Sequence, residues 1–244
     1  MSEEKLNVGV VGVGYLGSIH ARIYERMQNV RLVGVMDSDA ETGRRVASEC
    51  GCKVMQSLEE MMDNVDAVSV VVPTSKHREI AEPFLEQRIP VLLEKPVAHT
   101  LSDAQAIVEL ANRKSTQLQI GHLERFNAGV VKLAAELDRP RFIEVHRLGE
   151  FVARATDVDV VTDLMIHDIG IILSLVPAGI KNIHASGVNV VSNTADIANV
   201  RIEFTDGCVA NLTSSRISQK QMRKLRIFQH NNYITIDFLL GSVE

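Results

Sequence analysis

Three glycines near the start of the chain have the spacing of a phosphate-binding loop. Gly12, Gly14 and Gly17 form the pattern G-x-G-x-x-G directly after an apolar run. In such a loop the first glycine allows a sharp turn, the second admits a pyrophosphate against the backbone, and the third lets a helix pack closely on a strand. The helix that follows would point its free N–H groups at the phosphates. Tyr15 and Leu16 lie inside the pattern and are expected to contact the same ligand.

An acidic residue follows the glycines at the distance of a ribose-binding carboxylate. Asp37 comes 20 residues after Gly17 and closes the second apolar run. A carboxylate at this place accepts hydrogen bonds from the adenosine ribose hydroxyls. It favours NAD over NADP, because Asp37 would repel a 2′-phosphate and neither Ser38 nor Asp39 could receive one. An S-adenosylmethionine site could also use the acid, but the third glycine at the longer spacing argues against it.

A lysine stands at the end of another predicted strand, where ligands bind in parallel sheets. Glu94, Lys95 and Pro96 follow the apolar residues 91–93. Pro96 biases Lys95 away from helical geometry and allows a cis peptide, so the lysine is expected at a rigid strand exit. This makes Lys95 a candidate catalytic residue, with a salt-bridged structural lysine as the alternative.

Two weaker candidates follow neighbouring predicted strands. Their polar residues are Pro73, Thr74 and His77 in the first stretch and His122, Arg125 and Asn127 in the second. A turn and a helix cap explain the first stretch as well as a place beside the cofactor does. The second stretch begins the next domain and is a candidate substrate contact, although His122 alone would more often be a structural histidine.

A stripe of polar and small residues crosses an otherwise apolar helical segment. Asp163, His167, Gly170 and Ser174 are spaced 4, 3 and 4 residues apart, so in an α-helix they share one face. An aspartate and a histidine are costly to bury there, and the glycine would leave room for an approaching group. The pair is either a general base with its orienting carboxylate or a buried fastening of the helix. Metal binding is the weaker alternative, because no further ligand has helical spacing.

The elements that must position these residues follow two patterns. Before residue 121, apolar runs alternate with helical periods, which predicts an α/β domain with a Rossmann-type doubly wound parallel sheet. The predicted strands are Leu6–Val11, Val30–Met36, Lys53–Met55, Ala67–Val72, Val91–Glu94 and Gln117–Gly121, with helices starting near Ser18, Ala40, Leu58, Lys76 and Ser102. Asp39 and Ser75 are suitable helix caps. Residues 1–121 are expected to form the NAD-binding domain.

Residues 122–244 read as a second, substrate-binding α+β domain. The expected elements are helices Ala128–Leu137 and Val158–Val176 and strands Arg141–Leu148, Ile183–Val191, Ile197–Phe204, Cys208–Ser214, Leu225–Gln229 and Tyr233–Phe238. Turn residues at 205–207 and 230–232 punctuate the last four strands as hairpins. This pattern predicts a mostly antiparallel sheet with helix on one face.

Composition excludes some classes of partner and indicates the compartment. The net charge of −5 offers no basic field for nucleic acid, and no apolar run approaches the length of a membrane span. The first residues are acidic and polar, so we expect no signal peptide and a cytoplasmic protein. The three cysteines fit neither a disulfide framework nor a zinc site, and no metal is expected.

The motifs G-V-G-Y-L-G, E-K-P and D-L-M-I-H-D, in this order, resemble the Gfo/Idh/MocA family of oxidoreductases along essentially the whole chain. The resemblance implies that the glycines and Asp37 bind NAD, that Glu94 approaches the nicotinamide ribose, and that Lys95, Asp163 and His167 form the reaction site. Residues 121–127 are similar to the branch that oxidises the 3-hydroxyl of nucleotide-linked N-acetyl sugars such as UDP-N-acetylglucosamine. Family members continue with a final helix packed on the nucleotide domain, so the second domain is expected to be incomplete or trimmed at its carboxyl end.

The expected activity is hydride transfer between a secondary sugar hydroxyl and NAD. His167, oriented by Asp163, would accept the hydroxyl proton while Lys95 stabilises the developing oxyanion, although the two roles could be exchanged. Four basic residues could meet a substrate diphosphate, but solvated surface charge is the better explanation for each: Arg125, Arg154, Arg216 and Lys220. The alternatives are a non-catalytic NAD-binding sensor or scaffold and, within the family, an inositol or free-sugar dehydrogenase. The outward face of the carboxy-terminal sheet is expected to form a homo-oligomer.

Overall fold

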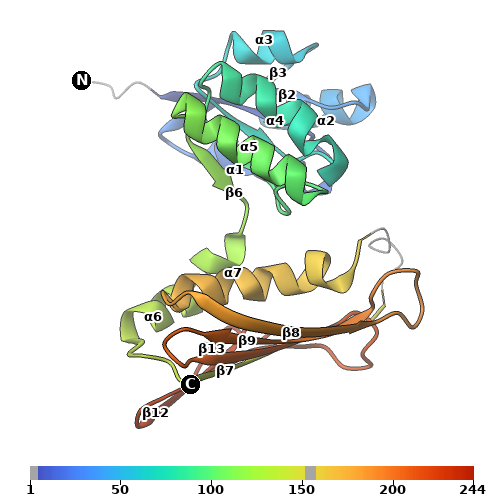
Figure 1. The fold of residues 1–244 in the computed structure, drawn as a ribbon. Helices are drawn as coiled ribbons and strands as arrows, with labels where there is room; N and C mark the ends of the chain where they lie inside the picture. Colours follow the sequence, from blue (N-terminus) through green and yellow to red (C-terminus); the bar gives the residue numbers. More distant parts are fainter. Residues whose placement is uncertain (1–4, 152–157) are drawn as a thin grey trace. The chain divides into compact units, whose positions relative to one another are not determined.

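The structure, a computed structural model, describes residues 5–151 and 158–244 of the chain (Figure 1). Backbone contacts divide the chain into two units. The first unit comprises Met1–Gly121 and the second His122–Glu244. Each unit has hydrophobic core clusters of its own, and each is described by itself below.

The first unit is built on a six-stranded parallel sheet in the order β3-β2-β1-β4-β5-β6. Its strands are β1 (Leu6–Val11), β2 (Val30–Met36), β3 (Lys53–Val54), β4 (Ala67–Val70), β5 (Val91–Leu93) and β6 (Leu118–Ile120). Its helices are α1 (Tyr15–Arg26), α2 (Ala40–Cys50), α3 (Leu58–Met62), α4 (His77–Glu86) and α5 (Leu101–Lys114), with a 3₁₀ turn η1 (Thr74–Lys76) before α4. The strand order reverses between β1 and β4, as in a doubly wound sheet.

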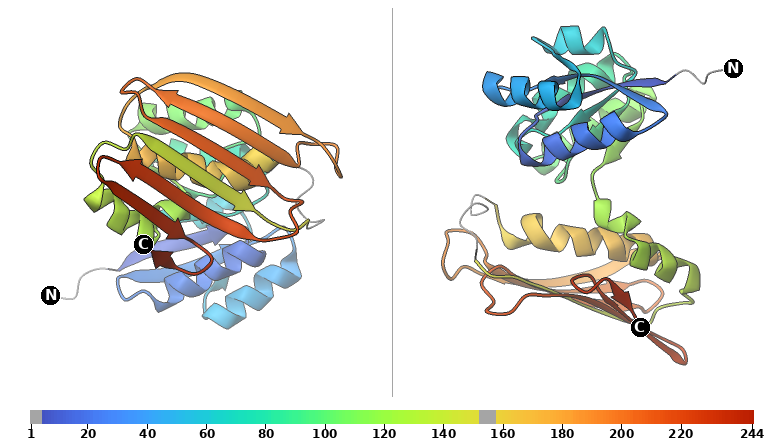
Figure 2. Two further views of the ribbon diagram at one scale, coloured as in Figure 1. Left: turned by 90° about the horizontal axis from the view of Figure 1, so that it is seen from below. Right: turned by 180° about the vertical axis from the view of Figure 1, so that it is seen from behind.

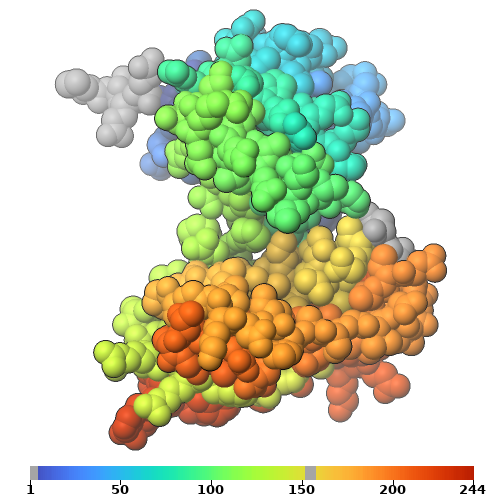
Figure 3. Space-filling model, in the orientation of Figure 1, coloured from blue at the N-terminus to red at the C-terminus, as the bar shows by residue number. Residues whose placement is uncertain are grey.

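Separate apolar clusters cover the two faces of this sheet. Ala21 of α1 and Val46 of α2 pack in one cluster, whereas Phe84 of α4 and Ile107 of α5 pack in the other. Side chains of α4 and α5 lie next to one another on the surface, where Arg78 donates to both Glu82 and Asp103 (Figure 3). Helices on both faces of a parallel sheet confirm the predicted α/β fold class of this half.

The helix starts of the first unit differ in detail from the prediction. Asp39 caps α2 as expected, by accepting from two N–H groups of the first turn. Ser75 is not a cap, because the chain enters the η1 turn first and α4 begins after Lys76, whose side chain makes no capping bond. The first helix begins at Tyr15, three residues earlier than predicted, directly after Gly14.

The second unit is built on a seven-stranded sheet in the order β13-β12-β11-β7-β10-β9-β8. Its strands are β7 (Phe142–Leu148), β8 (Ile180–Val188), β9 (Ile197–Phe204), β10 (Val209–Ser215), β11 (Met222–Gln229), β12 (Asn232–Asp237) and β13 (Ser242–Val243). The pair β7/β10 is parallel and the other pairs are antiparallel. Its helical segments are η2 (Leu123–Phe126), α6 (Ala128–Glu136), η4 (Val161–Met165) and α7 (Ile166–Leu175). Helices α6 and α7 cover one face of the sheet, as predicted (Figure 2).

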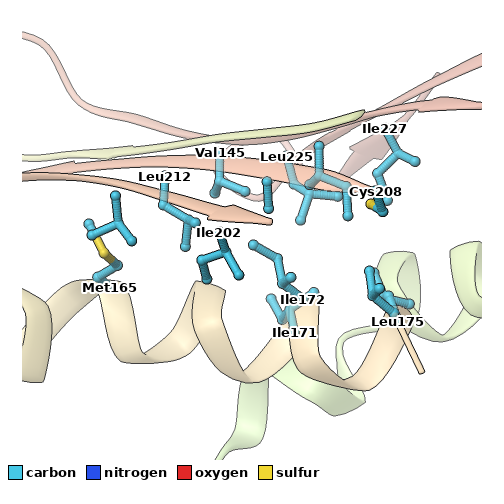
Figure 4. Close-up of a cluster of buried hydrophobic side chains, with 14 of the residues drawn as sticks. Val145, Met165, Ile171, Ile172, Leu175, Ile202, Cys208, Leu212, Leu225 and Ile227 are labelled. Carbon is cyan, nitrogen blue, oxygen red and sulfur yellow. The ribbon is translucent and has the colours of Figure 1, made fainter. Parts of the chain in front are cut away.

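Apolar side chains of α7 hold it on the sheet. Ile171 and Ile172 are fully buried and belong to one apolar cluster with Leu212 and Ile202 of the strands, between the helix and the sheet (Figure 4). Each such side chain contributes about 1.5–3 kcal/mol on burial. Residues of β9 alternate as predicted, with Ala198, Val200, Ile202 and Phe204 in the core and Ile197, Asn199, Arg201 and Glu203 on the outward face.

The helical segment that carries the predicted polar stripe is not one uniform α-helix. Residues 161–165 form a π-helical turn, and the α-helix runs from Ile166 to Leu175. Asp159 starts the segment by accepting from the N–H groups of Val161 and Thr162 at 2.8 and 2.9 Å, which a helix starting at Val158 would not allow. The four-residue spacing from Asp163 to His167 therefore crosses a change in helix type, so the shared face derived for an α-helix does not apply to Asp163.

Candidate functional site

The glycine loop has the geometry that a phosphate-binding turn requires. Gly12 has a φ of +84°, and a Cβ there would lie 2.4 Å from the carbonyl oxygen of Val71. A Cβ on Gly17 would lie 1.8 Å from the carbonyl oxygen of Gly12, so close packing of α1 requires glycine. Gly14 has no heavy atom within 4 Å of its Cβ position and is exposed, which leaves its backbone open to a ligand. The three positions thus match the three roles assigned from sequence.

The amino terminus of α1 suits an anion. Its first turn carries no acidic residue, and Gly14 at the N-cap offers no side chain to satisfy the free N–H groups. Free N–H groups and the helix dipole together favour negative charge at this end. Tyr15 and Leu16, which begin α1, are both exposed, with 80% and 48% of their surfaces accessible. The loop therefore fits the pyrophosphate of a dinucleotide.

Asp37 is held at the end of β2 by two backbone groups. Its Oδ2 accepts from the N–H of Val13 at 2.7 Å, and its Oδ1 accepts from the N–H of Asp39 at 2.9 Å. The first bond ties the carboxylate to the glycine loop. Each oxygen can accept a further hydrogen bond, as two ribose hydroxyls would require.

Glu94 and Lys95 stand at the carboxyl end of β5. The Glu94 carboxylate is buried, accepts from the Lys95 N–H at 3.2 Å, and lies so close to Gly121 that a Cβ there would be 2.7 Å from Oε1. Burial alone would raise the pKa of Glu94, but hydrogen bonds from His20 and the Lys95 N–H outweigh it and lower the pKa. Glu94 therefore carries a negative charge beside the lysine. The Lys95–Pro96 peptide is cis.

His77 links the loops that follow β4 and β5. It is 1% exposed, with Nδ1 at 2.9 Å from the carbonyl oxygen of Pro96 and Nε2 at 3.0 Å from that of Val72. Both ring nitrogens thus face main-chain oxygens within the unit. This geometry favours a structural role for the imidazole over direct contact with a cofactor. Pro73 and Thr74 precede it at the start of η1, where Pro73 is exposed and Thr74 is half-buried.

In the second unit, His122 lies against α7. Its Nδ1 would be 3.7 Å from a Cβ on Gly170, so the space that the glycine leaves beside the helix is filled by the His122 ring. The structure thereby brings two sequence candidates together. His167 lies in the first turn of α7, Asp163 lies in η4, and both are half-buried. Ser174 is exposed and donates to the carbonyl oxygen of Ile171 in its own helix.

A buried arginine connects the two segments that carry these histidines. Arg147 of β7 donates to both carboxylate oxygens of Asp168, at 2.8 and 2.9 Å, and to Glu124 at 3.3 Å. Arg147 and Asp168 are 3% and 1% exposed. Burial alone would lower the pKa of Arg147, but the hydrogen bonds and charge of Asp168 raise it. Because Glu124 is two residues from His122 and Asp168 is next to His167, the arginine fixes both segments on the sheet.

Of the four basic residues considered as diphosphate contacts, one was interpreted wrongly and one lies outside the described residues. Arg216 is 4% exposed and donates to Asp196 at 2.8 Å, so it is a buried structural cation and not a solvated charge. Arg154 falls outside the described residues. Arg125 and Lys220 are exposed. Asn127 is exposed as well and caps α6 by accepting from the Gly129 N–H.

Sequence reasoning missed four polar residues that support the candidate site: His20, Ser69, Arg147 and Asp168. All lie inside regular elements, His20 in α1, Ser69 in β4, Arg147 in β7 and Asp168 in α7, where a single sequence does not show which polar side chains turn inward. Asp168 follows His167 directly in the D-L-M-I-H-D motif, so the motif itself contained the signal. Among residues 5–151 and 158–244, no group of three or more His, Cys, Asp or Glu side chains could hold a metal ion.

The comparisons with known proteins agree with this architecture. Residues 6–122 match the family model described as an oxidoreductase family with an NAD-binding Rossmann fold, and residues 119–235 match that of the GFO/IDH/MocA C-terminal domain. A doubly wound dinucleotide-binding unit followed by such a sheet unit defines an NAD-binding oxidoreductase. The chain belongs to the Gfo/Idh/MocA family, which confirms the resemblance seen in the three motifs.

Individual relatives extend this similarity over nearly the whole chain. A UDP-N-acetylglucosamine 3-dehydrogenase of Acidithiobacillus ferrooxidans is 37% identical over 239 residues, which are 98% of this chain and 76% of that one. A solved structure of that enzyme, GnnA, covers 98% of this chain and 79% of its own with a TM-score of 0.93 and 36% identity. An inositol 2-dehydrogenase of Rubrobacter xylanophilus is 27% identical over 88% of this chain and 66% of that one. GenD2 from gentamicin A biosynthesis, solved in complex with NAD, shares the fold at 24% identity and a TM-score of 0.86, over 96% of this chain and 72% of its own.

The part of the chain that the structure describes contains no helix long and apolar enough to cross a membrane. Its three cysteines, at positions 50, 52 and 208, are free thiols.

Proposed function

We propose that this NAD-binding oxidoreductase oxidises the 3-hydroxyl of a nucleotide-linked N-acetyl sugar. The substrate class rests on the relative that carries this activity in its name and matches 98% of the chain. The observation that carries the reaction itself is the ionised, buried Glu94 followed by Lys95 at the carboxyl end of β5. The glycine loop lies at the same edge of the sheet, where ligands bind in open α/β folds.

The proposed division of labour follows the two units. Residues 1–121 bind NAD through the glycine loop and Asp37, and residues 122–244 bind the sugar. When bound, NAD supplies the nicotinamide carbon that accepts the hydride. Lys95 donates a hydrogen bond to the reacting oxygen and stabilises its negative charge. His167 accepts the hydroxyl proton, with Asp163 assigned to it as the orienting carboxylate by the family resemblance alone and with the exchange of roles between lysine and histidine as the alternative.

Two observations bear on the rival functions. A non-catalytic NAD sensor needs the glycine loop and Asp37, but it gives no reason to bury a charged carboxylate beside a lysine at the strand exit, which is costly. An inositol dehydrogenase is the second candidate within the family, favoured by relatives of that name at 27–37% identity over shorter parts of their chains. Both rivals are separated from the main proposal by the same assay.

The assay follows NADH absorbance with UDP-N-acetylglucosamine, myo-inositol and free N-acetylglucosamine as substrates. We expect turnover with the nucleotide sugar. His167→Ala should lower single-turnover hydride transfer by about 10²–10⁴-fold, the usual worth of a positioned general base, without loss of NAD affinity. Ser174→Ala is the matched control, because Ser174 is exposed on the same helix and bonds within it. Normal hydride transfer in a folded His167→Ala protein would refute the assigned role, and turnover with myo-inositol alone would refute the substrate.

We further propose that a cytoplasmic homo-oligomer forms through the outward face of the second sheet. Three aromatic rings on neighbouring strands contact one another on that face: Phe142 to Phe228 at 5.8 Å and Phe228 to Tyr233 at 4.8 Å between centroids. Tyr233 is 51% exposed, and aromatic residues are enriched at interfaces between proteins. Light scattering that gives a monomer mass at all protein concentrations would contradict the oligomer.

A further inference from the structure

A chain of polar side chains lies beneath the carboxyl end of β5 in the first unit. His20 of α1 has Nδ1 at 2.8 Å from Oγ of Ser69 in β4, and its Nε2 lies 3.4 Å from Oε1 of Glu94. Ser69 is fully buried, and the side chains of His20 and Glu94 are about one-tenth exposed. The Glu94 carboxylate accepts from the Lys95 N–H through its other oxygen. The chain thus runs from the middle of the sheet to the backbone of the candidate catalytic lysine.

One arrangement of protons gives Ser69, His20 and Glu94 hydrogen bonds to one another. The Ser69 hydroxyl can donate to Nδ1, which leaves the proton of a neutral imidazole on Nε2, facing the carboxylate. The ring of Tyr24 stands edge-on to the His20 ring, with centroids 6.5 Å apart. Gly121 allows the carboxylate to lie against its backbone, where any side chain would collide with it. The Glu94 carboxylate is therefore confined by His20, Gly121 and the Lys95 N–H.

We propose that His20 is a positioning residue for the hydride-transfer reaction, which it supports by holding the Glu94 carboxylate and, through it, the backbone of Lys95. The inference rests on the proposed function, because Glu94 and Lys95 are the groups assigned to the nicotinamide ribose and the reacting oxygen. His20 itself lies on the first helix, below the loop, and it acts on the reaction through Glu94.

Packing alone does not account for a histidine at this place. A leucine would fill similar space in the interior without the cost of burying an imidazole, whose nitrogens need hydrogen-bond partners. Without His20, Glu94 keeps the Lys95 N–H and loses the contact that stabilises its charged form from below. Displacement of a reacting group by about 1 Å can cost about 10²-fold in rate.

The test compares His20→Leu and His20→Gln with the wild type in the full chain. His20→Leu removes the contact at similar volume, whereas His20→Gln keeps an N–H that can reach Glu94. Arg22→Ala is the control on the same helix, because it removes an exposed ion pair with Glu49 on the surface. For each variant, melting temperature, NAD affinity between pH 4 and 8 and single-turnover hydride transfer are measured on one preparation.

We expect His20→Leu to slow hydride transfer by about 10²-fold and to move the acidic limb of NAD binding to higher pH, because the Glu94 carboxylate loses a partner of its charged form. His20→Gln should recover part of both effects, and Arg22→Ala should show neither. A His20→Leu protein that melts at lower temperature but keeps the wild-type rate and pH dependence would overturn the inference and leave His20 a structural residue.

Two further results separate this inference from the proposed function. If the wild type oxidises no sugar, the proposed function fails, while the pH dependence of NAD binding still decides whether His20 holds Glu94. Nitrogen NMR of the wild-type histidines gives the second check, which needs no variant to fold. The inference requires a proton on Nε2 of His20, and a spectrum with an unprotonated Nε2 would overturn it.

Discussion

Replacing Arg147 by methionine removes the cation from the interior of the second unit and leaves its partner in place. Asp168 then stays 1% exposed with neither of the two guanidinium bonds that it accepts in the folded protein. Glu124 is less affected, because 23% of its side chain is accessible and water can replace its bond to Arg147. The perturbation therefore amounts to one buried carboxylate without its counter-charge.

The expected loss of stability follows from that burial. Removing one partner of a buried ion pair costs about 3–5 kcal/mol, because the remaining charge is not compensated. The neighbouring strand β11 provides a matched control in Arg226→Met, which breaks the pair with Glu144 of β7 on the outward face. That pair has a similar length of 2.7 Å, but about a third of each side chain is exposed. Exposed pairs contribute about 0.2–1 kcal/mol, so the two variants should differ several-fold.

The assay is amide hydrogen exchange followed by mass spectrometry on peptides from β7 and α7. It gives the free energy of opening for the second unit separately, which a single melting curve of a two-unit chain does not. Peptides from the first unit serve as an internal reference and should be unchanged. If Arg147→Met lowers the protection of α7 by no more than Arg226→Met does, the buried triad is not what holds the helix, and the reasoning is refuted.

Two further predictions concern the cofactor and the response to acid. Asp37→Ala should weaken NAD binding by ~1.5–3 kcal/mol and barely change NADP binding, measured by calorimetry, and a wild type that binds both equally would contradict the assignment. Burial alone would raise the pKa of Asp196. Hydrogen bonds from the N–H groups of Val190 and Val191 and from the side chains of Ser192 and Arg216 outweigh this effect and hold the pKa well below its ordinary 3.8. Since the folded-state pKa is depressed, this stabilisation is present above the unfolded-state pKa and is lost as the pH falls through and below it. Exchange protection of β9 should therefore fall in acid in the wild type and depend less on pH in Asp196→Asn, and parallel pH profiles would refute this.

The sequence predicted the first unit closely because its signals are local. A parallel strand is a short apolar run, and the turn at Gly12 requires a backbone conformation that glycine adopts readily. The helix starts were less accurate where a 3₁₀ turn intervenes, as at Ser75, since cap residues occur in such turns too. Asp37 was found because its distance from the glycines reflects the length of one helix and one strand.

In the second unit, periodicity predicted the element types but not the π turn. Asp159, not the apolar pattern, sets where the helical segment begins. Arg216 was read as a surface charge because a single arginine in a sequence gives no sign of its partner. Its partner is Asp196, 20 residues earlier in the chain, and the two side chains meet only in the folded sheet.

The buried ion pair of Arg147 and Asp168 has a consequence for the candidate site as well as for stability. Replacing a buried ion pair by apolar residues of similar volume is often neutral or stabilising, so stability alone does not explain why such a pair is present. In Arg147→Met/Asp168→Leu the second unit should recover most of the protection lost in the single variant. The segments that carry His122 and His167 are then held by apolar contacts. Such contacts are less directional than a bidentate ion pair, so the orientation of the two rings should be less well defined. Recovered stability with slow hydride transfer would separate the two contributions of the Arg147 cluster, and recovery of both would assign the cluster to stability.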